Sequence, residues 1–145
     1  MQNAIVSILA LSLVACNPSA PAACERSPEA EAGTILYAGG NTLTSAPACA
    51  EEYNARSNRW RLNCRGGDVA LVVWAVEGER PSAAPEGSSV AVSEIALARG
   101  AATVQGPAYG STLTRRGDTF VIDALACERQ SVPLRANGFV LTLAP

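Results

Sequence analysis

The residues of this chain best suited to chemistry are its five cysteines, which are Cys16, Cys24, Cys49, Cys64 and Cys127. A cysteine thiol can carry a lipid, form a disulfide or bind a metal ion. Structural zinc sites usually draw on C-x-x-C pairs or on histidines, and the chain has neither. The sequence therefore predicts no metal site and no cofactor, and leaves acylation and disulfide formation.

Cys16 differs from the other cysteines because an uncharged, mostly apolar run precedes it. A run of about a dozen residues is too short to span a bilayer as a helix and has the length of a signal-peptide core. The tetrapeptide Leu13-Val14-Ala15-Cys16 resembles the lipobox of bacterial lipoproteins. We therefore expect residues 1–15 to be a cleaved signal peptide and Cys16 to carry the lipid. The plainer alternative is a buried N-terminal segment, and residues 1–3 do lack the usual lysine or arginine.

An acylated Cys16 would hold the chain in a membrane leaflet that faces the periplasm. Asn17 follows the cysteine, and Asn rather than Asp at this place favours the outer membrane over the inner membrane. The membrane is then a partner through the lipid alone.

The remaining four cysteines form an even set in a chain expected to be exported, which predicts two disulfides. Four cysteines allow three pairings, and the sequence does not choose among them. Pairing the nearest neighbours would join Cys24 to Cys49 and Cys64 to Cys127.

Composition divides the mature chain into a tether and one domain. Residues 16–33 are rich in Pro, Ala, Ser and Glu, which is typical of a flexible tether. Residues 34–145 are long enough for one domain. In that domain, apolar and β-branched runs predict strands. The strands are expected at 34–37, 60–64, 69–76, 90–97, 108–113, 119–125, 134–136 and 139–143.

The segments between these strands carry mostly turn signals. Tight turns are expected at Gly66–Gly67, at Arg116–Asp118 and at Asn137–Gly138, where Asn-Gly favours a type I′ hairpin. Pro133 would place its strand at a sheet edge. A loop is expected over 78–87, and a short helix capped by Ser45 is expected to run to Tyr53. The sequence thus predicts an all-β fold, a small antiparallel barrel or sandwich stabilised by disulfides.

The composition also excludes several functions. Without histidine, the usual Ser-His-Asp and Cys-His arrangements are impossible. The carboxylates Asp118 and Asp123 are close in sequence but lack a nucleophile and an orienting partner, so we expect no enzyme. The net charge is −2 and no basic stripe is present, so we expect no nucleic-acid partner.

From Trp60 to Cys127 the order of landmarks resembles the membrane-bound inhibitors of c-type lysozyme, which are small β-barrel lipoproteins. Their aromatic, cysteine, glycine turn and alternating strand correspond to Trp60, Cys64, Gly66 and residues 69–74. Their Ser-Gly-x-x-Tyr loop and Lys-Gly-Asp turn correspond to Gln105, Gly106 and Tyr109, and to Arg116, Gly117 and Asp118. The serine is replaced by Gln105, or by Arg99 if residues 99–101 are the counterpart, and the lysine is replaced by Arg116.

The resemblance implies an inhibitor function and a disulfide between Cys64 and Cys127. A c-type lysozyme works with two carboxylates in an open cleft. Arg116 would pair with the ionised carboxylate, Gln105 would donate to the other, and Tyr109 would support the loop. Arginine is a wider, planar replacement for lysine. The alternative is an assembly lipoprotein of the envelope without inhibitory activity, which binds through the edge of the last hairpin.

Overall fold

The computed structural model describes residues 29–37, 40–108, 110–125 and 134–145. The expected lipidation site Cys16 lies outside these residues, as do Cys24, Tyr109 and Cys127. Among the described residues, no helix has the length and apolar character needed to cross a membrane. The strands are β1 Thr34–Tyr37, β2 Asn41–Leu43, β3 Cys49–Asn54, β4 Arg59–Gly66, β5 Val69–Ala75, β6 Ser89–Arg99, β7 Ala102–Pro107, β8 Thr112–Arg116, β9 Thr119–Leu125 and β10 Leu134–Thr142, with a 3₁₀ turn η1 at Pro81–Ala83.

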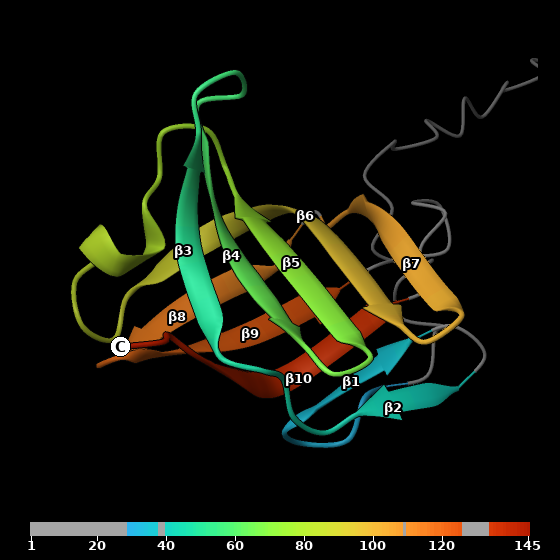
Figure 1. The fold of residues 1–145 in the computed structure, drawn as a ribbon. Coiled ribbons are helices and arrows are strands. Elements are labelled where there is room, and N and C mark those ends of the chain that lie inside the picture. The colour runs from blue at the N-terminus through green and yellow to red at the C-terminus, as the bar shows by residue number, and fades with distance from the viewer. Residues whose placement is uncertain (1–28, 38–39, 109, 126–133) are drawn as a thin grey trace, which may run out of the picture.

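The ten strands form one open antiparallel sheet in the order β2-β1-β10-β9-β8-β6-β5-β4-β3, with β7 paired to β6 beside this path. Figure 1 shows the sheet folded into two layers, in which β3 to β7 cross over β8 to β10. The predicted all-antiparallel β fold is therefore confirmed. The segment before β4 contributes β1, β2 and β3 to the same sheet.

β6 joins the two layers because it pairs with different strands along its length. Residues 89–91 pair with β8, whereas residues 92–99 pair with β5. Ser93 is the bulged residue, since Trp74 pairs with Glu94 and Ala75 pairs with Val92. The bulge lets one strand turn from one layer into the other. It also explains why the buried positions change from Val90 and Val92 to Ile95 and Leu97.

Alternate residues of both layers point inward and form one hydrophobic core. Its largest fully buried side chains come from both layers and include Phe120, Phe139, Leu62, Leu71 and Leu97. Where the chain ends, Leu143 forms an isolated bridge with Cys49, and the Ala144 amide donates to the Cys49 carbonyl over 2.8 Å. The C-terminus thus meets the free side of β3, so the two layers enclose the core.

Three two-residue turns link neighbouring strands, and each begins with a glycine at positive φ. These are Gly67-Asp68 (φ +58°), Gly100-Ala101 (φ +58°) and Gly117-Asp118 (φ +60°). Glycine first is the pattern of type II′ hairpins, whose twist matches that of the strands. The predicted turns at Gly66–Gly67 and Arg116–Asp118 are confirmed to within one residue.

The predicted helix ending at Tyr53 is wrong, because residues 49–54 form β3. Every residue from Cys49 to Asn54 pairs with one on β4. Tertiary pairing with β4 and the fixed position of Cys49 outweigh the local capping signal of Ser45 and Pro47.

The predicted hairpin at Asn137-Gly138 is also wrong, because β10 runs straight through these residues. β10 pairs with β9 up to Ala136 and again from Phe139, so Asn137 and Gly138 both lie opposite Asp123. This is a β-bulge, in which two residues oppose one. The Gly138 amide donates to Asp123 Oδ1 over 2.8 Å, which fixes the bulge.

The bulge replaces the hairpin for two physical reasons. A type I′ turn needs positive φ at both central residues, and of this pair Gly138 alone has it, at +61°. In addition, β10 lies between β1 and β9 and gains a full set of partners only as one long strand. The prediction that this strand lies at a sheet edge is therefore wrong as well. β7 is another difference, because Gln105 and Gly106 belong to this strand and not to the loop that the resemblance implied.

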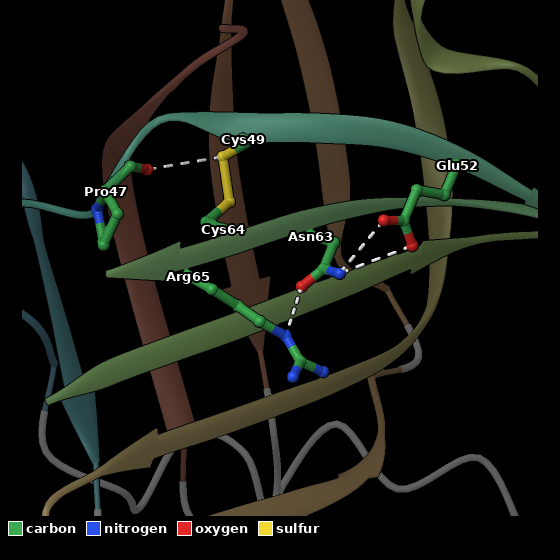
Figure 2. The surroundings of a disulfide bond; sticks show 6 residues. All are labelled: Pro47, Cys49, Glu52, Asn63, Cys64 and Arg65. Carbon is green, nitrogen blue, oxygen red and sulfur yellow. Dashed lines mark hydrogen bonds between the residues drawn. A yellow bond between two sulfur atoms is a disulfide. The ribbon is translucent and has the colours of Figure 1, made fainter. Parts of the chain in front are cut away.

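A disulfide joins Cys49 on β3 to Cys64 on β4, which lie directly opposite each other with their Cα atoms 4.0 Å apart (Figure 2). The Pro47 carbonyl lies 3.7 Å from Cys49 Sγ. The bridge overturns the pairing of Cys64 with Cys127 that the resemblance implied, and also the pairing of nearest neighbours. The other two cysteines of the predicted pair of disulfides, Cys24 and Cys127, lie outside the described residues.

Candidate functional site

The structure does not bring the two expected inhibitor residues together. Gln105 lies on β7 opposite Ala96, whereas Arg116 ends β8, beyond the pair formed by Ser89 and Thr114. Ala96 and Ser89, the β6 residues that mark these two positions, are seven residues apart, which is roughly 20 Å along the strand. Gly106 lies beside Gln105, opposite Ile95.

Gln105 also has a partner of its own. Its Nε2 donates to Glu94 Oε1 over 2.9 Å on the neighbouring strand. An exposed cross-strand pair of this kind contributes modestly to the sheet. The side chain is therefore engaged in the fold rather than held ready as a donor for a ligand.

Arg116, Gly117 and Asp118 form a hairpin tip that we call the Arg116 tip. The Gly117 amide donates to Glu86 Oε2 over 2.8 Å, and the Leu143 amide donates to the Asp118 carbonyl over 3.1 Å. Bonds from two different segments thus hold the backbone of the tip.

The residue before the tip is held just as firmly. The Arg115 amide donates to the Ser88 carbonyl, and the Gly87 amide donates to the Arg115 carbonyl. Arg115 Nη1 donates to the Ala84 carbonyl over 2.8 Å. The loop 84–88 therefore supports the tip, a role that no motif in the sequence indicates.

Arg116 is exposed, and its side chain has no hydrogen bond or ion pair within the described part of the chain. A Cβ built on Gly87 would lie 3.3 Å from Arg116 Nη1, so the guanidinium passes close over a residue without a side chain. Two carboxylates accompany it, that of Asp118 in the tip and that of Glu86 in the loop 84–88, which accepts from the Gly117 amide. The tip therefore presents an unpaired cation on a rigid support, with negative groups beside it.

A second cluster lies on the outer face of the layer β3–β6, and we call it the Arg–Trp row. Glu52, Arg61, Trp74 and Glu94 lie opposite one another on four successive strands. Arg61 and Arg59 lie over the Trp74 ring, at 5.0 and 4.9 Å from its centre. The sequence signal for this cluster is the alternation along β4, which turns both arginines away from Leu62 and the core.

The charges of the Arg–Trp row are paired within it. Arg61 Nε donates to Glu52 over 2.7 Å, and Arg59 lies 3.8 Å from Glu94. The Arg61 hydrogen bond lowers the pKa of Glu52, with burial opposing it and Asn63 adding to it. Exposed pairs like these contribute about 0–1 kcal/mol each. The row therefore strengthens the sheet and leaves little unpaired charge for a ligand.

Glu51 forms a third cluster, where the loop after β5 meets β3. Its carboxylate accepts from the Ser82 amide (2.9 Å), the Ser82 hydroxyl (2.6 Å) and Arg80 Nε (2.7 Å). Burial alone would raise the pKa of Glu51, but the hydrogen bonds from Ser82 and Arg80 outweigh it, so the pKa is lowered. Arg80 also stacks on Trp60 at 4.3 Å. These contacts fasten the turn η1 to the sheet.

No group of three or more His, Cys, Asp or Glu residues suited to a metal ion occurs among the described residues. Comparisons with protein-family models, with curated proteins and with solved structures found no match. The geometry is thus the basis for assigning a function. Of the clusters described here, the Arg116 tip combines a rigid support with an unpaired charge.

Proposed function

We propose that this protein is lipid-anchored in the bacterial envelope and acts by binding a partner through the Arg116 tip. One observation carries the proposal: an exposed arginine with no side-chain partner in the described structure, on a turn held by bonds from loop 84–88 and the C-terminus. A support that is already ordered lowers the entropic cost of binding. A guanidinium is well suited to a carboxylate, because it can donate two parallel hydrogen bonds.

The partner that we propose is a c-type lysozyme, whose open cleft holds two catalytic carboxylates. Arg116 would pair with the ionised one and block the cleft. Because Gln105 is bonded to Glu94 and lies roughly 20 Å away along β6, the proposed contact does not use Gln105. The negative groups Glu86 and Asp118 limit the affinity, since they face the same cleft.

The test is inhibition of a hen-type lysozyme by the purified, oxidised domain, residues 17–145, in a cell-wall clearing assay. We expect dose-dependent inhibition that Arg116→Ala weakens by at least about tenfold, since a desolvated charge pair contributes about 1.5–3 kcal/mol. Gln105→Ala should leave inhibition unchanged.

Arg56→Ala is the matched control, because Arg56 is also an exposed arginine in a hairpin loop, the one between β3 and β4. Equal losses in both arginine variants would reduce the effect to net charge and refute the tip as the contact. A folded wild-type domain that does not inhibit would refute the lysozyme partner.

A second candidate function is that of an assembly lipoprotein without inhibitory activity. It is favoured by the half-buried Trp74, held by Arg59 and Arg61 on an outer face, because Trp and Arg are enriched at protein–protein hot spots. This second function predicts that a photo-crosslinker at Asn63, beside the Arg–Trp row, captures an envelope protein. It also predicts that Trp74→Ala abolishes this capture. Capture that survives Trp74→Ala would refute it.

The lipid anchor is also a proposal, and it is supported by the tetrapeptide Leu13-Val14-Ala15-Cys16. Cells grown with clickable palmitate should label the wild-type protein and not Cys16→Ser. Label retained by Cys16→Ser would refute the lipobox.

A further inference from the structure

Arg135 is the buried charge that the proposed function does not use. It lies on β10 between Leu125 of β9 and Leu36 of β1, and 9% of the residue is exposed. Its Nε and Nη2 are buried and have no hydrogen-bond partner among the described residues. No carboxylate of those residues lies within ion-pair distance of it.

An unpaired buried guanidinium is costly to the fold. A guanidinium keeps its proton at any pH that proteins meet, so it cannot become neutral as a buried lysine can. Leaving a buried charge without a partner costs several kcal/mol in typical proteins. Because no described residue offsets this cost, an anionic ligand is the partner expected for Arg135.

Arg135 also lines a cavity of ≈ 320 Å³, next to Ala124, Ala136 and the backbone of Gly110. This is the volume of about ten water molecules in the liquid, enough for a ligand with a similar number of non-hydrogen atoms. Small-molecule sites typically occupy about 300–1,000 Å³ and combine apolar walls with a few polar groups. The cavity is at the lower end of that range.

The other polar groups of the cavity restrict the chemistry of the ligand. Two carboxylates, Asp123 and Glu29, and the amide of Asn137 share its wall with Arg135. The Asn137 amide nitrogen is engaged, since Nδ2 donates to the Ala30 carbonyl over 3.0 Å. Asp123 accepts from the Gly138 amide with Oδ1. Two negative groups would repel a phosphate dianion, whereas they would attract a cation bound beside the anion.

We propose that this cavity binds a zwitterionic α-amino-acid group, with the carboxylate on Arg135 and the ammonium group between Asp123 and Glu29. Arg135 meets a carboxylate with the donors that the fold leaves unpaired, and the acidic wall accepts the ammonium protons. The group belongs either to a free amino acid or to a diamino-acid side chain of a cell-wall peptide, which carries the same two charges on one carbon. The site is independent of the Arg116 tip, which ends β8 at the other end of its pairing with β9.

The test is isothermal titration of the oxidised domain, residues 17–145, with alanine, acetate, methylamine, inorganic phosphate and a diaminopimelate-containing tripeptide. We expect alanine or the tripeptide to bind at least about tenfold more tightly than acetate or methylamine. Acetate offers only the carboxylate, and methylamine offers only the ammonium group. If alanine binds more tightly than the tripeptide, the natural ligand is a free amino acid. If the tripeptide binds more tightly, the natural ligand is a peptide of the cell wall.

Arg135→Met should abolish binding while the domain stays at least as stable, because an unpaired buried charge is replaced by an apolar side chain of similar length. Asp123→Asn should weaken alanine binding and leave acetate binding unchanged. Arg116→Ala is the control and should bind as the wild type does, so failure here is distinct from failure of the lysozyme contact. Three results would overturn the proposal: no binding by the wild type, unchanged binding by Arg135→Met, or phosphate bound as tightly as alanine.

Discussion

Two groups of arginines, one on each layer of the sheet, differ in their partners. Arg59 and Arg61 on β4, and Arg80 in the loop after β5, each have a carboxylate partner, and each also lies over a tryptophan ring. In the layer β8–β10, Arg116 is exposed and Arg135 is buried, and neither has a side-chain partner among the described residues.

The difference follows from which residues lie opposite one another on neighbouring strands. On β3 to β6, Glu52 lies opposite Arg61, and Trp74 lies opposite Glu94. On β10, Arg135 lies opposite the uncharged residues Leu36 and Leu125, and Val140 lies opposite Val121. Paired charges contribute to stability, whereas unpaired charges are available for a ligand. We therefore place both proposed binding sites in the layer β8–β10.

Among the changes that test this comparison, removal of the disulfide in the layer β3–β6 is expected to lower the free energy of unfolding the most. Replacing Cys49 and Cys64 together by alanine opens a loop with a sequence separation of 15 residues, which should lower the free energy of unfolding by about 3 kcal/mol. Urea unfolding of the double variant measures the loss.

Peptide mapping of the oxidised double variant provides the control, since Cys24 and Cys127 should still be bridged if the chain holds two disulfides. A loss below about 1 kcal/mol would show that the sheet positions β3 without the bridge.

Glu51→Gln should give the next largest effect, and it depends on pH. The pKa of Glu51 is lowered in the folded chain, so the unfolded chain takes up the proton first as the pH falls. The stabilisation is complete above the ordinary glutamate pKa of about 4.3 and is lost as the pH drops through the folded value. Because the Glu51 side chain is 8% exposed, we expect a loss of about 2 kcal/mol at pH 7.

Glu52→Gln is the matched control, since the pKa of Glu52 is also lowered but its side chain is 38% exposed. Its loss should be at most about 0.5 kcal/mol. Urea unfolding at pH 7 and pH 3 measures both. If Glu51→Gln and the wild type lose equal stability between these pH values, the Ser82 and Arg80 contacts do not act as described.

The smallest expected loss of stability comes from replacing one glycine in a turn of one layer and one glycine in the bulge of the other. Gly67 and Gly138 have nearly equal positive φ, +58° and +61°, and a Cβ on either would have no atom within 4 Å. Alanine at each position should therefore cost only backbone strain, about 1 kcal/mol. Thermal unfolding of Gly67→Ala and Gly138→Ala measures this cost. A Gly138→Ala variant as stable as the wild type would contradict the positive φ of the bulge.

Local signals were reliable in this chain where an apolar, β-branched run or a glycine turn marks the element itself. The strands near 34–37, 60–64 and 69–76 and the turns after Gly66 and Arg116 were predictable for this reason. Asn137-Gly138 was misread because the same dipeptide fits a hairpin or a bulge, and the partners on both sides of β10 decide between them. The helix expected up to Tyr53 failed for the same reason, since β4 imposes a strand.

The separation of Gln105 from Arg116 could not be predicted either. Both follow β6 in sequence, but β7 and β8 pair with different parts of that strand. The bulge at Ser93 turns β6 from one layer to the other, and no sequence motif near Gln105 or Arg116 indicates this turn.

The sequence by itself determined the antiparallel β class, the positions of most strands and the absence of histidine chemistry, and the lipid anchor at Cys16 is its prediction alone. These follow from composition and from patterns shorter than a hairpin. Only the tertiary structure decided that Cys49 pairs with Cys64 and that β10 continues through Gly138. It also decided that Arg135 is buried with no hydrogen-bond partner for Nε and Nη2 among the described residues, while Arg61 has one. The reason is physical: pairing and burial depend on which distant strands meet, and the local sequence fixes only the faces that they present.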